Sequence, residues 1–252
     1  MRILLTNDDG IDAPGLQLLF KSLNTKYDVW VIAPERERSA SSHSITLKKP
    51  ICLKKRSKQV FTCSGTPADC VLTASRCIIP DHIDMIISGI NHGLNLGTDI
   101  IYSGTVAAAR QGALMGKPSI AISLPGNKKD LELAVPVEFI VNNIEVFYSV
   151  WSENHFLNIN FPEEFKYPVQ TCITFPSKRI YKDKFSTFDA PNGDLYCFLH
   201  GDDADSHNEE GSDHSAIRKG IISLSPVLIH PSNHKIEEIY QNANFWKGNK
   251  GS

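Results

Sequence analysis

The sequence predicts an α/β fold: a doubly wound, mostly parallel sheet followed by a β-rich C-terminal extension. Up to about residue 165, short apolar runs typical of strands alternate with stretches whose apolar residues recur at helical spacing. Beyond that point, short β-like pieces are separated by polar loops. Because strands separated by helices pair in parallel through right-handed crossovers, the alternating part is expected to form the sheet.

The first elements follow from local patterns. The apolar run Ile3–Leu5 predicts the opening strand. Apolar residues at helical spacing predict a helix over Gly15–Leu23, and the β-rich run Tyr27–Ala33 predicts the second strand. The next helix is expected to begin after Thr66 and to run to about Cys77. A capping threonine, a proline in the first turn and an aspartate at the capping-box position mark its start.

The rest of the core repeats this alternation. The remaining strands are expected at the β-rich runs Ile83–Ser88, Ser119–Leu124 and Phe156–Phe161. Helices are expected over Thr105–Met115, which a glycine and a proline close, and over about Asp130–Trp151. No linker or repeat divides this part, so we predict one domain over 1–252, with an α/β core (1–165) and an extension (166–252).

The predicted extension holds three β-like pieces, at Gln170–Phe175, Leu195–Leu199 and Ile221–Val227. The acidic and polar stretch Gly201–His214 is expected to be a mobile loop. These pieces are interpreted as an antiparallel extension, which is a kind of arm that often mediates contacts between subunits.

The composition narrows the class of protein. A formal net charge of -2 over 252 residues gives no overall attraction for nucleic acid or anionic membranes, so neither is expected as a partner. No apolar run is long enough to cross a bilayer. Asp8, Asp9 and Asp12 interrupt the apolar start, so no secretory signal is expected. Six cysteines without a C-x-x-C pair favour free thiols and a cytoplasmic protein.

Two adjacent carboxylates, Asp8 and Asp9, stand where the first strand ends. Repulsion and desolvation make such a pair costly unless a cation lies between the two side chains. Asn7 and Gly10 beside them also suit an ordinary turn, which is the alternative interpretation.

Three strand ends are expected to meet near these carboxylates. The second strand ends in the polar loop Pro34–Ser39, and the third ends in Gly89–Asp99, which is rich in asparagine and glycine. Ligands of open parallel sheets gather outside the carboxyl ends of the strands. The oxygen ligands expected to converge there belong to Asp8, Asp9, Ser39 and Asn91. Such hard ligands suit one divalent cation, Mg²⁺ or Mn²⁺, although the asparagine also fits a simple turn.

A second candidate feature is the turn Ser103-Gly104-Thr105, which immediately precedes a predicted helix. Backbone N–H groups at a helix start, with the positive end of the helix dipole behind them, form a cradle for phosphate. An ordinary helix N-cap is the alternative. Because Asn95 and its asparagine-glycine loop are close in sequence, a site shared with the cation is expected.

Other catalytic motifs are absent from the sequence. It has no H-E-x-x-H, no G-x-S-x-G, and no G-x-G-x-x-G after the first strand. The basic run Lys48–Lys58 is interpreted as a solvated strand pair, with a role in holding longer polyanions as the alternative.

Several motifs together resemble the SurE family of 5'-nucleotidases. These are TNDDG with a following APG, APERERSASSHSIT, SGTPADCV, SGINHGLNLGTDIIYSGTVAAA and SDHSAIRKGIISLSP, and the similarity covers nearly the whole chain. The resemblance implies a Rossmann-like core and a C-terminal extension used in dimer or tetramer assembly. It implies one divalent cation held by the aspartates of NDDG, the serine of the E-R-S loop and the asparagine of SGIN. In this chain those residues are Asp8, Asp9, Ser39 and Asn91.

The resemblance also implies hydrolysis of nucleoside monophosphates, with 3'-nucleotides and short polyphosphate as further substrates of some members. Our hypothesis is metal-assisted phosphomonoester hydrolysis, in which Asp8, in preference to Asp9, acts as a base towards water. Phosphoryl oxygens would be held by Asn95, Ser103, Gly104 and Thr105.

Two other functions remain open at this stage. An aspartyl-phosphate phosphatase also places an aspartate after the first strand, but it requires D-x-D spacing, and the aspartates are adjacent here. A non-catalytic nucleotide sensor would use the same phosphate cradle, although phosphate recognition alone does not require paired carboxylates.

Overall fold

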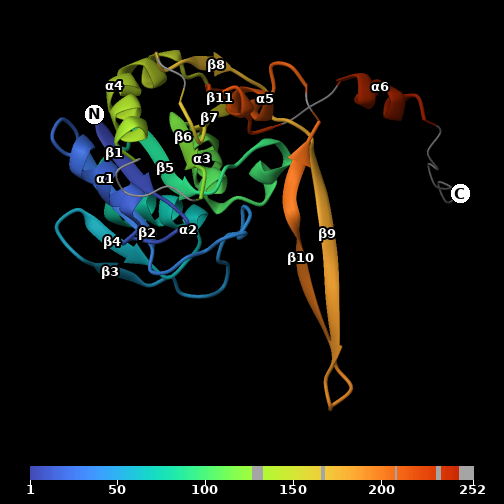
Figure 1. The fold of residues 1–252 in the computed structure, drawn as a ribbon. Coiled ribbons are helices and arrows are strands. Elements are labelled where there is room, and N and C mark those ends of the chain that lie inside the picture. The colour runs from blue at the N-terminus through green and yellow to red at the C-terminus, as the bar shows by residue number, and fades with distance from the viewer. Residues whose placement is uncertain (127–132, 166–167, 208, 231–233, 244–252) are drawn as a thin grey trace, which may run out of the picture.

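The computed structural model describes residues 1–126, 133–165, 168–207, 209–230 and 234–243. It contains a nine-stranded sheet flanked by helices and a separate two-stranded hairpin that projects from the body (Figure 1). The predicted fold class is confirmed.

The strands of the main sheet are β1 (Arg2–Thr6), β2 (Asp28–Pro34), β3 (Leu53–Lys55), β4 (Val60–Cys63), β5 (Met85–His92), β6 (Ser119–Leu124), β7 (His155–Asn160), β8 (Thr171–Ile173) and β11 (Ile222–Leu228). The hairpin consists of β9 (Arg179–Asp189) and β10 (Leu195–Ser206). The helices are α1 (Pro14–Leu23), α2 (Pro67–Thr73), α3 (Gly104–Leu114), α4 (Ala134–Val150), α5 (Asp213–Arg218) and α6 (His234–Gln241). A π-helical turn, η1 (Ala74–Ile78), continues α2, and a 3-10 helix, η2 (Gly97–Ile101), precedes α3.

The order of the strands positions the site. The sheet runs β3-β4-β2-β1-β5-β6-β7-β11-β8, and neighbouring strands from β4 to β7 pair in parallel. The chain moves outward from β1 through β2 and β4, then returns to add β5 on the other side of β1. The switch point of the sheet therefore lies between β1 and β5, where an open α/β sheet leaves a crevice for ligands.

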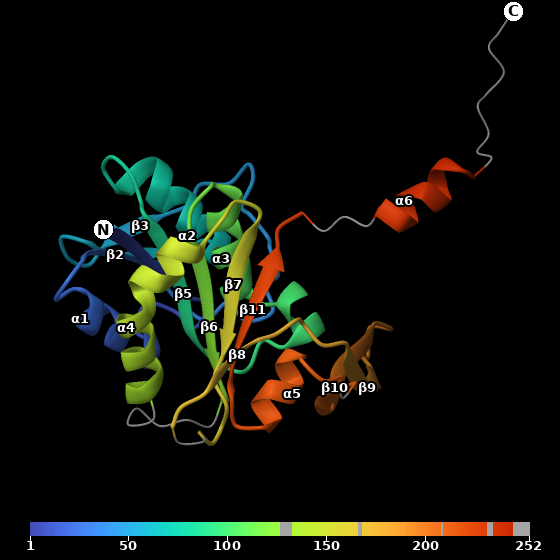
Figure 2. The same ribbon diagram turned by 90° about the horizontal axis from the view of Figure 1, so that it is seen from above.

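Helices cover both faces of the sheet (Figure 2). On one face, α1 and α4 pack over a core that includes Ile3 and Leu5. On the other face, α2 and α3 pack near Leu4 and Ile32. Successive strand residues point to opposite faces, so this alternation along β1 buries the strand on both sides and explains its continuous apolar run.

The capping box that predicted α2 is present. The Thr66 side chain accepts a hydrogen bond from the backbone N–H of Asp69, and the Asp69 side chain accepts one from the backbone N–H of Thr66. The start of α4 was expected near residue 130, but residues 127–132 lie outside the described part of the chain. The third strand is longer than expected, because β5 continues to His92 after an irregularity in its register between Ser88 and Asn91.

The prediction of a mobile loop over Gly201–His214 is wrong. The first residues of that stretch belong to β10, which pairs with β9 in antiparallel register, and α5 begins at Asp213. Strand β9 was not predicted at all. Both strands stand mostly in solvent, so they lack the alternation of buried and exposed residues that marks a strand in a sequence.

Part of the expected extension belongs to the main sheet. Strand β11 pairs antiparallel with β7, and β8 pairs with β11 in parallel. In the basic run, β3 pairs antiparallel with β4, and Lys54 forms an exposed ion pair of 3.3 Å with Glu35. None of the helices in the described ranges has the length and apolar character needed to span a membrane.

Candidate active site

The acidic pair lies in a tight turn directly after β1. The Asn7 side chain closes this turn, because its amide nitrogen donates to the Gly10 carbonyl (2.8 Å) and its oxygen accepts from the Gly10 N–H (3.2 Å). Gly10 has φ +106°, a conformation that suits glycine. The turn expected from the sequence is therefore present, and it presents Asp8 and Asp9 at the carboxyl end of the sheet.

Asp8 is held against the start of α3. The Thr105 hydroxyl donates to Asp8 Oδ1 in a short hydrogen bond, and the Asp8 residue is only 4% exposed. Gly104 permits this approach, because a Cβ there would lie 3.0 Å from Asp8 Oδ2 and 2.7 Å from Ser41 Oγ. Oδ2 is the oxygen that Thr105 leaves available on this side chain.

Asp9 is held by the neighbouring strand. The backbone N–H of His92, at the end of β5, donates to Asp9 Oδ2 at 3.3 Å. The two carboxylates are thus fixed by different elements, Asp8 by α3 and Asp9 by β5.

Electrostatics disfavour the charged form of both side chains. Burial and, to a lesser degree, repulsion from Asp9 raise the pKa of Asp8 to about 6, against the lowering effect of the Thr105 hydrogen bond. Burial, with a contribution from Glu37, also raises the pKa of Asp9. A bound cation would remove this penalty, which is the electrostatic reason to expect a metal between the two side chains.

The loop after β2 lies against the acidic turn, because the N–H of Arg38 donates to the Asp8 carbonyl at 2.7 Å. The next residue, Ser39, is exposed, and its hydroxyl donates to Glu37 Oε1 at 2.5 Å. The amide nitrogen of Asn91 donates to the Gly93 carbonyl at 2.8 Å, which leaves Oδ1 as its available acceptor.

Sequence reasoning missed Ser41. Its Oγ is buried, has no hydrogen-bond partner among the described residues, and lies with Asp8 Oδ2 around Gly104. Burying a hydroxyl without a hydrogen-bond partner costs free energy unless a bound ligand supplies the missing partner. The serine-rich run around this residue was the available signal, but its pattern could not single out one hydroxyl.

The residues at this end of the sheet fit a hard divalent cation. Two carboxylates with raised pKa values, an amide oxygen and serine hydroxyls match the preference of Mg²⁺ or Mn²⁺ for oxygen ligands. Within the described ranges, no group of three or more His, Cys, Asp or Glu residues is arranged to hold a metal. A site of this kind would therefore depend on neutral oxygen ligands as well as on the two aspartates.

The predicted phosphate cradle has two different parts. Ser103 caps α3, because its Oγ accepts from the N–H of Val106 (3.1 Å), which is the ordinary role of an N-cap serine. Gly104 and Thr105 form the first turn of the helix, next to Asp8. The N–H groups of this turn and the helix dipole are suited to an anion.

Asn95 lies in a buried polar network with β6 and β7. Its amide nitrogen donates to Ser123 Oγ (2.7 Å), and its backbone N–H donates to Asn160 Oδ1 (2.9 Å). Its carbonyl accepts from the side chains of Asn158 and Asn160. The bond to Ser123 uses one of the two N–H donors of the Asn95 amide, and the network holds the loop in place.

The fold and the site together define an α/β protein of the doubly wound class, with an acidic pair facing a helix N-terminus at the switch point of its sheet. The family model described as "Survival protein SurE" matches residues 3–183. The chain belongs to the SurE family.

Relatives and a solved structure agree with this assignment. The chain is 39% identical to the 5'-nucleotidase SurE of Pseudothermotoga lettingae, over 98% of this chain and 99% of that one. It is 41% identical to the 5'-nucleotidase SurE of Thermoanaerobacter sp. strain X514, over 90% and 92% of the two chains. The crystal structure of the SurE protein from Aquifex aeolicus superposes with a TM-score of 0.81 at 33% identity, covering 96% of this chain and 98% of that chain.

Proposed function

We propose that this protein is a phosphomonoesterase that uses a divalent cation to hydrolyse nucleoside 5'-monophosphates to nucleoside and phosphate. The observation that carries the proposal is the buried Asp8 carboxylate, held by Thr105 at the N-terminus of α3 beside a second carboxylate. Relatives named 5'-nucleotidase SurE, aligned over nearly the whole chain, support the choice of substrate. We include 3'-nucleotides and short polyphosphate as further substrates.

Each residue at this end of the sheet has a role in this mechanism. Asp8, Asp9, Ser39 and Asn91 would hold one Mg²⁺ or Mn²⁺ ion. When bound, the cation would polarise a phosphoryl oxygen and lower the pKa of a coordinated water. The start of α3, at Gly104 and Thr105, holds phosphoryl oxygens through its N–H groups. Asp8 accepts the proton of the attacking water at Oδ2, while Thr105 fixes the orientation of its carboxylate through Oδ1.

A phosphate-release screen tests this proposal. Purified protein is incubated with the 5'-monophosphates of the common nucleosides, with 3'-AMP and with tripolyphosphate, in the presence of Mg²⁺, Mn²⁺ or EDTA. We expect release from 5'-AMP or another 5'-monophosphate with Mn²⁺ or Mg²⁺, and none with EDTA. If AMP binds but persists after long incubation with Mn²⁺, the protein is a nucleotide sensor. A trapped phospho-enzyme would instead indicate the aspartyl-phosphate mechanism.

We further propose that the β9–β10 arm joins copies of this chain into a dimer or tetramer. Both of its faces carry exposed apolar side chains: Phe185, Phe188, Leu195, Tyr196, Phe198 and Leu199 are each more than half exposed. Cross-strand pairing places Tyr196 opposite Phe188 and Leu199 opposite Phe185. A two-stranded hairpin alone is only marginally stable in water, so a surface of this kind calls for a partner.

Light scattering coupled to size-exclusion chromatography tests the assembly. The wild-type protein is expected to elute at two or four times the mass of one chain, and the double substitution Phe185→Ser with Phe198→Ser is expected to lower that mass. A monomeric wild-type protein would contradict the proposal.

The cytoplasm is the proposed compartment. All six cysteines lie in the described residues and are free, and two of them, Cys63 and Cys70, are buried. Unpaired thiols are typical of a reducing compartment.

A further inference from the structure

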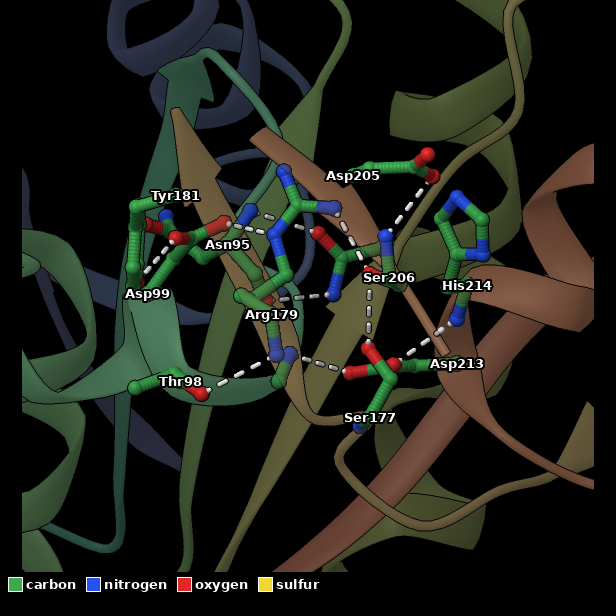
Figure 3. A network of polar contacts seen from close by, with 12 residues as sticks. Asn95, Thr98, Asp99, Ser177, Arg179, Tyr181, Asp205, Ser206, Asp213 and His214 are labelled. Atoms are coloured by element: carbon green, nitrogen blue, oxygen red, sulfur yellow. Dashed lines mark hydrogen bonds and ion pairs between the residues drawn. The ribbon is translucent and has the colours of Figure 1, made fainter. Parts of the chain in front are cut away.

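A polar network joins the base of the β9–β10 arm to the 3-10 helix η2, far from it in sequence (Figure 3). The centre of the network is Asp99. Arg179 Nε lies 2.9 Å from Asp99 Oδ2, and the two side chains are only 12% and 23% exposed. The Tyr181 hydroxyl donates to Asp99 Oδ1 at 2.8 Å. Two residues of β9 thus bind one carboxylate of η2: the contact of Arg179 is partly buried, while Tyr181 is 39% exposed.

The arm contacts η2 at further points. The backbone N–H of Arg179 donates to Thr98 Oγ1 (3.2 Å), and its guanidinium donates to Ser206 Oγ on β10 (2.9 Å). Arg179, which belongs to β9, therefore contacts both β10 and η2.

Asp213, the first residue of α5, binds the N-terminal end of η2. Its fully buried carboxylate accepts from the N–H of Gly97 (2.7 Å) and from the N–H of Ser177 (2.9 Å). Gly97 has φ +50°, and a Cβ there would collide with the Ser177 carbonyl. The backbones of η2 and of the segment that leads into β9 are thus in direct contact.

The network continues from η2 to the acidic turn. The Asp99 carbonyl accepts from the N–H groups of Tyr102 (3.0 Å) and Ser103 (3.2 Å). Ser103 is the N-cap of α3, and Thr105, two residues later, binds Asp8. A shift of Asp99 would therefore move the cap, and with it the first turn of α3.

We propose that Arg179 and Tyr181 are positioning residues: by holding Asp99, the base of the arm sets the place of the Ser103–Thr105 turn for the phosphoryl group. The inference rests on the proposed function for its kinetic consequence, but its structural consequence is measurable without any hydrolysis. It gives the arm a role within its own chain in addition to any role in assembly.

The test compares two tyrosines on the same arm. Tyr181→Phe removes the hydroxyl that binds Asp99, while Tyr196→Phe removes a hydroxyl from an exposed ring on β10 that forms no hydrogen bond with η2 among the described residues. With AMP and Mn²⁺, we expect Tyr181→Phe to lower kcat about tenfold, since a hydrogen bond to a charged group is lost. The dissociation constant for inorganic phosphate should rise by a similar factor. Tyr196→Phe should match the wild type in both measurements.

Substitutions at Arg179 and Asp99 add a rescue experiment and a test of whether Tyr181 acts through Asp99. Arg179→Ala should lower kcat at least as much as Tyr181→Phe, and Arg179→Lys, which keeps the charge, should restore part of the loss. In an Asp99→Ala background, Tyr181→Phe should cause no further loss, because the hydroxyl has no carboxylate left to hold. Additive losses from these two substitutions would overturn the proposed route through Asp99.

Amide hydrogen exchange provides the readout that is independent of catalysis. In Tyr181→Phe, exchange at Tyr102 and Ser103 should accelerate several-fold, with the oligomer mass unchanged. Exchange and phosphate binding equal to those of the wild type would overturn the inference. If the wild type releases no phosphate but exchange at these two amides still responds, the proposed function fails and the positioning role stands.

Discussion

Replacing Asp8 by asparagine is expected to remove hydrolysis and, at the same time, to make the metal-free protein more stable at neutral pH. Hydrolysis should fall by about 10³-fold, because the variant loses the carboxylate that we propose as both a metal ligand and the base. Stability should rise because the folded protein raises the pKa of Asp8 from 3.8 to about 6, so the ionised carboxylate is disfavoured in the folded state. Asparagine still offers an oxygen to the Thr105 hydroxyl, and it carries no charge.

The sign of the pH dependence follows from linkage. Because the folded-state pKa lies above the unfolded-state value, the contribution of the Asp8 carboxyl to stability is fully present below pH 3.8 and is lost as the pH rises through about 6. A shift of about two pKa units corresponds to about 3 kcal/mol at neutral pH. The advantage of Asp8→Asn should therefore be present at pH 7.5 and nearly absent at pH 4.

Thermal denaturation in the presence of EDTA at these two pH values provides the measurement. Asp12→Asn is the matched control, since Asp12 is an exposed aspartate shortly after the same turn. It should change neither the melting temperature nor the rate of hydrolysis. If Asp8→Asn melted below the wild type at pH 7.5, the carboxylate would be a stabilising structural group and the electrostatic argument for a bound cation would fail.

The elements near the acidic pair could be predicted because their signals are local. An apolar run buried on both faces marks β1, and a capping box between Thr66 and Asp69 marks α2. The neighbourhood of Asp8 with the start of α3 followed from the rule about strand ends in parallel sheets and from the closeness of the Ser103–Thr105 turn to the asparagine-glycine loop in sequence.

The features that could not be predicted from the sequence depend on contacts between distant segments. Arg179 and Asp99 are 80 positions apart, and nothing local in either segment indicates that they form an ion pair. In the arm, only Leu195–Leu199 was predicted as a β-like piece. Strand β9 and the rest of β10 were not predicted, because neither strand has a buried face that would give it a regular alternation. The contacts of Asn95 with Ser123 on β6 and Asn160 on β7 could not be read from its asparagine-glycine loop, and its role in binding phosphate stays a prediction.

Removing the metal should abolish hydrolysis, and the strength of metal binding should depend on pH in a way set by Asp8. EDTA is expected to reduce phosphate release by at least about 10³-fold, and excess Mn²⁺ should restore it, because the proposed cation polarises a phosphoryl oxygen and lowers the pKa of the attacking water. A cation competes with a proton for the Asp8 carboxylate, whose pKa in the metal-free protein is raised to about 6.

The affinity for Mn²⁺ should therefore be nearly constant above pH 7 and fall about tenfold for each pH unit below 6, since one proton must leave for one ion to bind. Electron paramagnetic resonance of free Mn²⁺ measures this affinity without any substrate. Asp8→Asn should bind Mn²⁺ weakly and show little of this pH dependence, whereas Asp12→Asn should follow the wild type. Equal affinity of the wild type at pH 5 and pH 7.5 would contradict a cation bound to Asp8, and hydrolysis that persists in EDTA would contradict its role in the reaction.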